Sequence, residues 1–417
     1  MRVTLVTIGS RGDAEPYVAL GCALARAGHS VRVATCEPFR DFVAAQGLSF
    51  FRLGGDIKAI VGDEGRAALA QAGANPVRAL RALRRFVGPL VREAHDALDA
   101  ALSGSDVVIG HLLVPGAQAY SEHRGMLYVD AAYVPALPTR AFAHPGAPPG
   151  TAPGLASLFS HLAAEQLIWQ AFRADVDASL GRVLGRVRSP LLGPYGLSLK
   201  RRAPKLLAFS PEVVPPPRDW PSHAHVTGYW FLPPPADWAP PRRLVEFLEA
   251  GEPPVYVGFG SMTVERPEEV TRAVLEGVRR AGRRAVLSAG WGGLAERAER
   301  DDVLFVGDVP HAWLFPRVAG VVHHGGAGTT AAAFRAGVPQ VAVPFLADQP
   351  FWGHRVARLG AGPEPVPIGE LAPDRLHRAL VSMGSPAMAR RAGEIGIRIR
   401  EERGAERAVE VIERLAA

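Results

Sequence analysis

The sequence predicts an α/β protein with parallel sheets in two domains, and three observations carry this prediction. Short β-branched runs alternate with helical patterns in both halves of the chain, which is typical of parallel βαβ units. Clusters of proline separate the halves, and 417 residues exceed the size that one ordinary core covers. We expect a first domain at residues 1–214, a proline-rich linker at 215–243, a second domain at 244–395 and a C-terminal helix at 396–417.

The first half contains five predicted strands, each followed by a helical or loop pattern. These strands are Arg2–Ile8, Ser30–Thr35, Asp106–Gly110, Met126–Asp130 and Lys205–Phe209. Between the first two, Pro16–Ala27 has apolar residues at helical spacing, and proline is favourable in the first turn of a helix. Residues 145–154 are rich in proline and glycine, and Leu155–Leu184 is predicted as a helix outside the sheet.

The second half repeats the α/β pattern after the proline clusters. Proline removes a backbone donor and stiffens the chain, so residues 215–243 are predicted as a connector between domains. The predicted strands that follow are Val255–Phe259, Ala285–Ser288, Val303–Val306, Val318–Val322 and Val338–Val343. The last stretch, Pro386–Leu415, is predicted as one long helix with a charged face.

Composition excludes several classes of protein. No stretch of about 18 or more apolar residues could span a bilayer, and the N-terminus lacks the layout of a signal peptide. Cys22 and Cys36 are too few for a disulfide framework, so we expect reduced thiols and a cytoplasmic location. The net charge of +6 is only weak evidence for an anionic partner, because a GC-rich genome by itself gives an arginine-rich composition. We expect no nucleic-acid partner.

The most informative segment, residues 322–353, combines a strand end, a glycine-rich turn, a helix and a second strand. Two histidines precede the turn, and Thr329 opens the helix. Small residues let backbone N–H groups approach a ligand closely, and a helix N-terminus attracts anions. The segment therefore predicts a site for a phosphate-bearing ligand, with a simple tight connection as the alternative. The loop lacks a Gly-Lys-Ser/Thr ending, so it is not a Walker-type NTP site.

Five motifs together carry a resemblance to a known family. They are GSRGDAEP at 9–16, PVYVGFGSM at 254–262, VGDVPHAWLF at 306–315, HHGGAGTT at 323–330 and DQPFWG at 348–353. In this order and spacing, the sequence resembles the inverting, nucleotide-sugar-dependent family-one glycosyltransferases of the GT-B fold. Within the family it looks most similar to the sterol 3-glucosyltransferases and to actinobacterial natural-product enzymes.

The resemblance implies a fold and a reaction. The fold would be two Rossmann-like domains facing each other across a cleft, with the last helix crossing back to pack on the N-terminal domain. The expected reaction moves a sugar from a UDP- or dTDP-sugar to a hydroxyl of a lipophilic acceptor, such as a polyketide or glycopeptide aglycone or a sterol. No cofactor is expected, and the protein is expected to be a monomer or a homodimer.

Donor-binding residues of the family carry over to matching positions. The resemblance places Ser261, His324, Gly326, Gly328 and Thr329 at the diphosphate, with Ser10, Arg11 and Gly12 in the corresponding turn of the first domain. It places Val309 and His311 at the nucleobase edge. Plant members have a tryptophan at the position of Asp308, so Trp291 is the candidate for stacking on the base, with a packing role as the alternative.

Two acidic residues are candidates for the chemistry of the sugar and the acceptor. Asp348 and Gln349 resemble the pair that binds sugar hydroxyls, although Asp348 also stands where a helix cap would. Asp13 is the predicted general base, because a carboxylate is ionised at neutral pH and can accept a proton. The alternative is that Asp13 is the N-cap of the helix that begins at Pro16.

No metal site is predicted. His323 and His324 are adjacent on a strand and therefore point to opposite faces, and no cysteine or carboxylate cluster accompanies them. Phosphate stabilisation by His324 and the helix dipole would make a metal unnecessary.

The acceptor site is the least defined part of the prediction. Loops at 54–92, 111–115 and 131–145 are expected to form it, with His111, Leu112, Tyr133 and Phe142 as candidate contacts. A basic helix at 78–92 presents either a solvated face or a surface for an anionic membrane. Two rival functions stay open: a GT-B-like UDP-sugar epimerase and a non-catalytic protein that assists a partner transferase.

Overall fold

The computed structural model describes residues 1–56, 62, 64–65, 68, 76–148, 150–185, 191–193, 203–235, 238–260, 262, 264, 266–288, 290, 294 and 301–417. Contacts divide the chain into two units. Unit 1 comprises Met1–Pro211, Pro215–Leu232 and Arg403–Ala417, and unit 2 comprises Glu212–Val214 and Pro233–Glu402.

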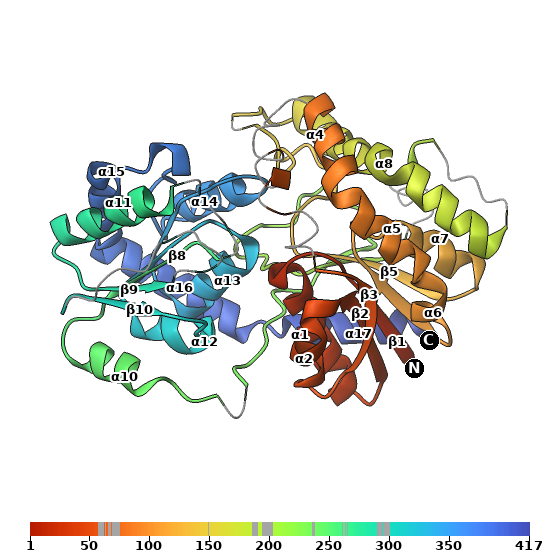
Figure 1. Ribbon diagram of the computed structural model, residues 1–417, viewed down its shortest axis with the longest axis horizontal. Helices are drawn as coiled ribbons and strands as arrows, with labels where there is room; N and C mark the ends of the chain where they lie inside the picture. Colours follow the sequence, from red (N-terminus) through yellow and green to blue (C-terminus); the bar gives the residue numbers. More distant parts are fainter. Residues whose placement is uncertain are drawn as a thin grey trace. The chain divides into compact units, whose positions relative to one another are not determined.

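Unit 1 is built on a seven-stranded parallel sheet with the strand order β3-β2-β1-β4-β5-β6-β7 (Figure 1). Its strands are β1 (Arg2–Val6), β2 (Ser30–Cys36), β3 (Ser49–Gly54), β4 (Val107–Gly110), β5 (Leu127–Ala132), β6 (Lys205–Leu207) and β7 (Ala224–Val226). Its helices are α1 (Arg11–Arg26), α2 (Arg40–Ala44), α4 (Pro76–Ala82), α5 (Gly88–Asp96), α6 (Leu98–Leu102), α7 (Gly116–His123), α8 (Leu155–Leu184) and α17 (Gly404–Ala416), with single turns at Glu37–Phe39 and Leu83–Val87.

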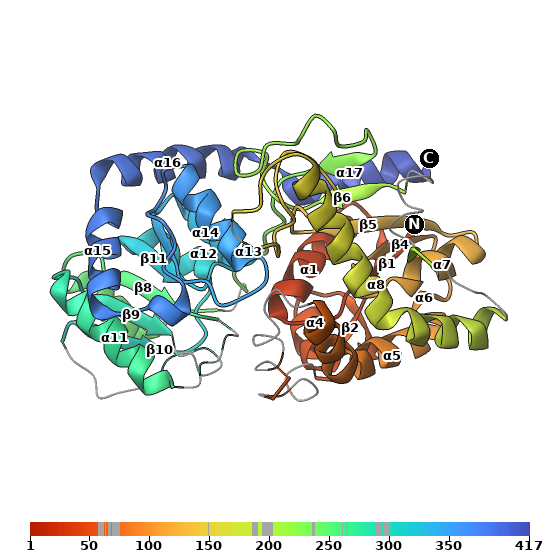
Figure 2. The ribbon, with the colours of Figure 1, turned by 90° about the horizontal axis from the view of Figure 1, so that it is seen from above.

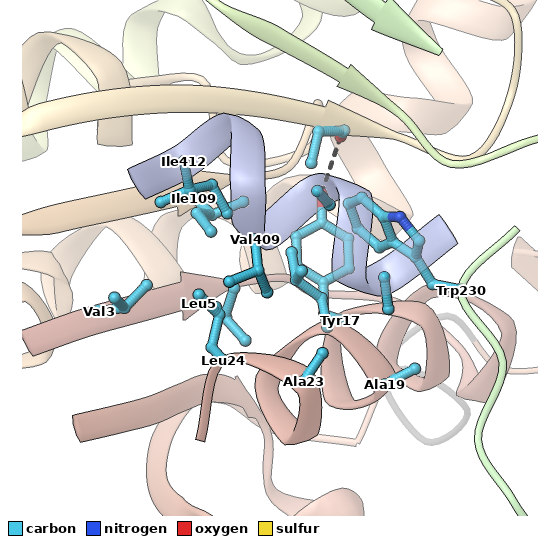
Figure 3. Packing of buried hydrophobic residues seen from close by; sticks show 14 of the residues in the cluster. Val3, Leu5, Tyr17, Ala19, Ala23, Leu24, Ile109, Trp230, Val409 and Ile412 are labelled. Carbon is cyan, nitrogen blue, oxygen red and sulfur yellow. Dashed lines mark hydrogen bonds between the residues drawn. The ribbon is translucent and has the colours of Figure 1, made fainter. Parts of the chain in front are cut away.

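Helices cover both faces of this sheet, because successive side chains of a strand point to opposite sides. Leu5 of β1 belongs to a hydrophobic cluster with α1 and α17, whereas Val6 belongs to a second cluster with α5, α6, α7 and α8. Figure 3 shows the first cluster, in which Tyr17 of α1 lies near Val409 and Ile412 of α17. The C-terminal helix is therefore part of the core of unit 1.

Unit 2 is built on a five-stranded parallel sheet with the order β10-β9-β8-β11-β12. Its strands are β8 (Val255–Gly258), β9 (Ala285–Ser288), β10 (Val303–Val306), β11 (Gly320–His323) and β12 (Gln340–Ala342). Its helices are α10 (Arg242–Glu249), α11 (Pro267–Arg280), α12 (His311–Leu314), α13 (Ala327–Ala336), α14 (Gln349–Arg358), α15 (Pro373–Met383) and α16 (Pro386–Glu401), with 3₁₀ turns at Phe315–Arg317 and Ile368–Glu370.

The two faces of the second sheet are also covered. Val257 of β8 packs in a cluster with α11 and α15, and Tyr256 packs in the opposite cluster with α10, α12 and α13. Helix α16 lies against α13 (Figure 2). Each face of each sheet therefore has its own hydrophobic core.

The order of strands reverses at one central strand in each unit. In unit 1, β2 and β3 lie on one side of β1, and β4 to β7 lie on the other. In unit 2, β9 and β10 lie on one side of β8, and β11 and β12 lie on the other. Open α/β sheets bind ligands at the carboxyl ends of the strands beside such a reversal. The turns after β1, β4, β8 and β11 are therefore the places to look for a site.

All ten predicted strands are present with ends that differ by a few residues, and α8 has the predicted bounds. Two further strands, β3 and β7, were not predicted; both lie at the edges of the sheet. Helix α1 begins at Arg11 and not at Pro16, which stands inside it. The helix starts early because Ser10 and Asp13 hydrogen-bond to each other across its first turn.

The C-terminal part also differs from the prediction. The expected single helix over Pro386–Leu415 is two helices, α16 and α17, interrupted at Glu402 and Arg403. Unit 1 resumes at Arg403, later than residue 396, and Gly404 approaches the main chain of Gly228 and Tyr229 so closely that a Cβ would lie 2.2 Å from a carbonyl oxygen. The expected linker at 215–243 is shorter, because Pro215–Leu232 belongs to unit 1 and includes β7.

Candidate functional site

The turn between β1 and α1 folds the carboxylate of Asp13 back over its own backbone. Asp13 Oδ2 accepts hydrogen bonds from the backbone N–H of Ser10 at 2.6 Å and from its hydroxyl at 2.8 Å. Gly9 has a φ of +140°, and a Cβ there would lie 2.3 Å from Asp13 Oδ2. The close approach therefore requires glycine at this position. Ser10 is the N-cap of α1, so the alternative that Asp13 is the N-cap is wrong.

The second oxygen of Asp13 contacts a residue from a different strand. The Tyr133 hydroxyl donates to Asp13 Oδ1, and Tyr133 directly follows β5. Its ring stacks on His111 at 5.9 Å between centroids and 15° between planes, and His111 directly follows β4. His111 Nε2 lies 3.5 Å from the Tyr133 hydroxyl. Asp13, Tyr133 and His111, which we call the carboxylate cluster, thus meet at the carboxyl ends of β1, β4 and β5.

His111 is the buried member of the carboxylate cluster. Burial lowers the pKa of its imidazole, while the negative charges of Asp13 and Asp130 partly offset that effect. Its Nδ1 is buried and has no hydrogen-bond partner in the part of the chain that the structure describes. The ring edge of His111 also packs on Tyr17, whose hydroxyl reaches the backbone oxygens of Gly110 and Ala131 (Figure 3 shows Tyr17).

The remaining predicted residues of unit 1 have other surroundings. Arg11 forms an ion pair with Glu15 at 3.0 Å and lies over the ring of Phe42. Gly12 is exposed in the first turn of α1, and Leu112 is half-buried. Phe142 packs against His161 and Trp220, in an aromatic group from the loop and from α8.

In unit 2, the turn between β11 and α13 surrounds His324 with glycines. A Cβ at Gly326 would lie 2.3 Å from His324 Nε2, and one at Gly260 would lie 3.1 Å from Cε1. Burial lowers the pKa of His324 to about 4, with a further contribution from His311. The imidazole is therefore neutral at pH 7, and its buried Nδ1 has no hydrogen-bond partner among the described residues.

Helix α13 adds backbone donors beside this histidine. Gly326 is its N-cap, so Ala327, Gly328 and Thr329 are the first residues whose N–H groups have no acceptor within the helix. Gly328 is exposed and Thr329 is half-buried. A neutral imidazole with an unused nitrogen, next to a helix N-terminus, is suited to bind an anionic oxygen.

His323 has a separate structural role. Its Nδ1 accepts from the Gly325 N–H at 3.1 Å, and its Nε2 lies 2.8 Å from Gln340 Oε1. Burial lowers its pKa to about 3. The rings of His323 and His324 are nearly perpendicular. In the part of the chain that the structure describes, no group of three or more His, Cys, Asp or Glu side chains is placed to hold a metal.

The loop before α14 places Asp348 and Gln349 in different environments. Asp348 Oδ2 accepts from the indole N–H of the buried Trp352 at 2.7 Å, and Asp348 makes no capping hydrogen bond to α14. Gln349 is buried, and its Oε1 accepts from the N–H groups of Phe345 and Leu346 at 2.7 and 3.2 Å. Both the oxygen and the Nε2, which lies 3.3 Å from Met262 Sδ, are used inside the protein. Gln349 therefore braces the loop from inside, and its contact with sugar hydroxyls stays a prediction.

The residues expected at the nucleobase are described in part. His311 begins α12 and stacks on Phe315 with centroids 4.3 Å apart. Val309 is buried in the same hydrophobic cluster as Phe315. Ser261 and Trp291 lie outside the described residues.

Sequence reasoning missed two features of these sites. The spacing Ser10-x-x-Asp13 is a capping-box pattern, and it could have shown that the helix starts before Pro16. The contact between Tyr133 and Asp13 joins residues 120 positions apart, and no local pattern announces it.

Residues 3–95 match the model of the glycosyltransferase family 28 N-terminal domain, and residues 296–417 match the erythromycin biosynthesis protein CIII-like C-terminal domain. The O-mycaminosyltylonolide 6-deoxyallosyltransferase of Streptomyces fradiae is 37% identical over 426 residues, covering 100% of this chain and 98% of that protein.

Sterol glucosyltransferases are also similar over almost the whole chain. A sterol 3-beta-glucosyltransferase of Arabidopsis thaliana is 34% identical over 421 residues, covering 98% of this chain. The chain spans 64% of the length of that plant protein and 27% of the corresponding Cryptococcus neoformans protein.

Solved structures agree in fold. The glycotransferase of kitacinnamycin has a TM-score of 0.71 at 20% identity and covers 100% of this chain and 99% of its own. SsfS6 of Streptomyces sp. SF2575, in complex with thymidine diphosphate, has a TM-score of 0.61 at 19% identity, with 99% of each chain covered. The two parallel sheets with their helices are thus a GT-B fold. Among the described residues, no helix combines the length and apolar character that crossing a membrane needs.

Proposed function

We propose that this chain, which belongs to the glycosyltransferase family that includes the sterol 3-beta-glucosyltransferases and the macrolide glycosyltransferase of Streptomyces fradiae, transfers a sugar from a nucleotide diphosphate sugar to a lipophilic alcohol. The observation that carries the proposal is His324, a neutral imidazole beside the N-terminus of α13. An anionic oxygen of a diphosphate would accept from an N–H of the imidazole and from the free N–H groups of the helix together.

The leaving group is the first chemical demand of the reaction. When the bond between the anomeric carbon and the diphosphate breaks, negative charge develops on the diphosphate oxygen. His324 would donate an N–H to that oxygen, and the N–H groups of Gly328 and Thr329 at the start of α13 would add to its stabilisation. Loss of one such donor typically lowers kcat by about 10²–10³-fold.

The acceptor hydroxyl is the second demand. Asp13 would accept its proton while the acceptor oxygen forms a bond to the anomeric carbon and the diphosphate departs, so that the configuration inverts in one displacement. The Oδ2 atom of Asp13 already accepts two hydrogen bonds from Ser10, so Oδ1 is the better placed oxygen for this proton.

The relatives suggest the class of acceptor and donor. One is named for a sterol and another for O-mycaminosyltylonolide, and both of these compounds have a large apolar skeleton with a free hydroxyl. We therefore propose a polycyclic or macrocyclic alcohol as acceptor. The donor would be a UDP- or dTDP-sugar. In support of this, the structure of SsfS6, which has a similar fold, was solved with thymidine diphosphate. The reaction would need no metal, because His324 and α13 supply the stabilisation of the leaving group.

The experiment is a transfer assay with and without EDTA. Purified protein is incubated with UDP-glucose or dTDP-deoxysugars and with sterol or macrolide aglycones, and products are identified by mass and by the anomeric configuration in NMR. We expect a glycosylated acceptor of inverted configuration, formed equally in EDTA. An epimerised free donor without transfer would indicate the epimerase, and inactivity with every pair would indicate an auxiliary protein. Activity that EDTA abolishes and Mg²⁺ restores would refute metal independence.

A further inference from the structure

We propose that Tyr133 is a positioning residue that orients the carboxylate of Asp13, and that His111 in turn holds Tyr133. The inference rests on the proposed function, because it assigns these two residues to the proton-transfer step. It changes the interpretation of Tyr133 and His111, which the sequence predicts as contacts of the acceptor.

The direction of the hydrogen bonds follows from the groups themselves. An ionised carboxylate only accepts, so the proton between Tyr133 and Asp13 Oδ1 comes from the phenol. The phenol oxygen can then accept a hydrogen bond, and His111 Nε2 lies 3.5 Å from it. His111 therefore carries its proton on Nε2 and leaves Nδ1 as a bare acceptor, which agrees with the absence of a partner for Nδ1. Burial of His111 keeps the ring neutral.

The hydrogen bonds from Ser10 and Tyr133 together determine which lone pair of the Asp13 carboxylate stays free. Two donors of Ser10 occupy Oδ2, and Tyr133 occupies one side of Oδ1. With three donors in place, the carboxylate cannot turn about its side-chain bond without breaking a hydrogen bond. The second lone pair of Oδ1 is thereby held in one direction, ready to accept the proton of an incoming hydroxyl.

The surrounding polar groups do not compete for this position. The hydroxyl of Tyr17 is directed to the backbone oxygens of Gly110 and Ala131. The carboxylate of Asp130 pairs with Lys205, and burial raises the pKa of the Cys36 thiol to about 11, so the thiol is uncharged. Tyr133 is thus the group outside the β1–α1 turn that donates to Asp13 in the described contacts.

The test is a double-mutant cycle between Tyr133→Phe and Asp13→Asn, read by steady-state kinetics. Removing a hydrogen bond to a charged group is expected to lower kcat by about 10–150-fold in Tyr133→Phe. The acceptor KM should stay within about twofold, because the phenyl ring remains. In the Asp13→Asn background, Tyr133→Phe should have almost no further effect, since there is no carboxylate left to orient.

A matched pair at position 111 provides the second arm. His111→Gln keeps an N–H donor near the place of Nε2, whereas His111→Leu removes it. We expect His111→Gln to retain most of the kcat and His111→Leu to resemble Tyr133→Phe, with no additional loss when the two are combined. Urea unfolding of the wild type, Tyr133→Phe, Asp13→Asn and the double variant measures the coupling free energy between Tyr133 and Asp13. This measurement does not require turnover.

Each outcome separates the two hypotheses. A wild-type protein without transfer in any assay would contradict the proposed function, while energetic coupling in the unfolding cycle would still support the positioning contact. If Tyr133→Phe raises the acceptor KM and leaves kcat unchanged, Tyr133 is an acceptor contact and the inference is wrong. Losses that multiply in the double mutant would also overturn it.

Discussion

Asp348 shows how one side chain can serve both structure and binding. One of its oxygens accepts from the indole of Trp352, which is completely buried, and this bond anchors the loop to α14. Ala347, just before it, has a φ of +58°, in the left-handed region that residues other than glycine seldom adopt. A backbone held in this way at a loop is a common feature of binding sites. The neighbouring Gln349 holds the loop from inside.

We predict that Asp348→Ala weakens binding of the full nucleotide sugar by about 10–150-fold, as expected for a lost hydrogen bond to a charged group. UDP or dTDP alone should bind nearly as in the wild type. Asp348→Asn is the matched control, because its amide oxygen can still accept from Trp352. Calorimetric titration with both ligands makes the comparison. If Asp348 only anchors the loop, Asp348→Ala will lower the thermal stability and will weaken the binding of both ligands to the same extent.

For single residues, the sequence predicts the place in the fold better than it predicts the side-chain contacts. The strand ends that carry Asp13, His111, Tyr133 and His324 follow from β-branched runs and glycine-rich turns. The contact between Asp13 and Tyr133 depends on strands β1 and β5, which are separated by β4 in the sheet, and only the fold brings them together. The internal role of Gln349 was not predicted, because its two backbone partners depend on the path of the loop.

The turn from β11 into α13 is the element on which the donor site depends. Gly326 has φ −64° and ψ 146°, which any residue can adopt, so its importance lies in the space beside His324. The other glycine of that space, Gly260, has a φ of +59° and needs glycine for its backbone as well.

We predict that Gly326→Ala lowers the affinity for UDP and dTDP by about 10–150-fold, as expected for loss of one hydrogen bond to a charged group. The new Cβ would lie 2.3 Å from His324 Nε2 and would displace the ring. Gly369→Ala is the control, since a Cβ there meets no atom within 4 Å. Nucleotide affinities that match in the two variants would show that His324 does not bind the diphosphate.

The helices and strands that the sequence predicts correctly are those with a long apolar pattern or a buried position in the sheet. Helix α8 and the central strands follow from apolar periodicity, whereas β7 has three residues and lies at an edge. The break between α16 and α17 contains no proline and falls in the charged run Arg400–Arg403, just before Gly404. It is set by the close approach of Gly404 to the main chain of unit 1, a tertiary constraint.

Across the whole molecule, buried neutral histidines tie stability to pH. Among the described residues, burial lowers the pKa of seven imidazoles, namely His95, His111, His144, His161, His225, His323 and His324. In the unfolded chain these groups take up protons near pH 6.5. The unfolded state therefore binds more protons at mildly acid pH, and stability is lost as the pH falls.

We predict that the urea midpoint falls when the pH is lowered from 7.5 to 5.5. Each imidazole that titrates only in the unfolded state contributes up to about 1.4 kcal/mol per pH unit. Glu165 acts in the opposite direction, because burial raises its pKa to about 7, but it is one group against seven imidazoles. A midpoint that is constant or higher at pH 5.5 would contradict the neutral state of these histidines.

The division into two α/β units follows from the repeated pattern of the sequence, and the return of α17 to unit 1 was expected from the family resemblance alone. Its packing against α1 and Trp230 makes the C-terminus part of the first core.

The most direct test of the account is the kcat of Asp13→Asn at saturating donor and acceptor. The amide has the shape of the carboxylate but cannot take the proton, so we predict a loss of about 10²–10⁴-fold in kcat, with the affinity for the nucleotide unchanged. A variant that keeps more than about a third of the wild-type kcat would show that another group removes the proton, and the mechanism proposed here would be wrong.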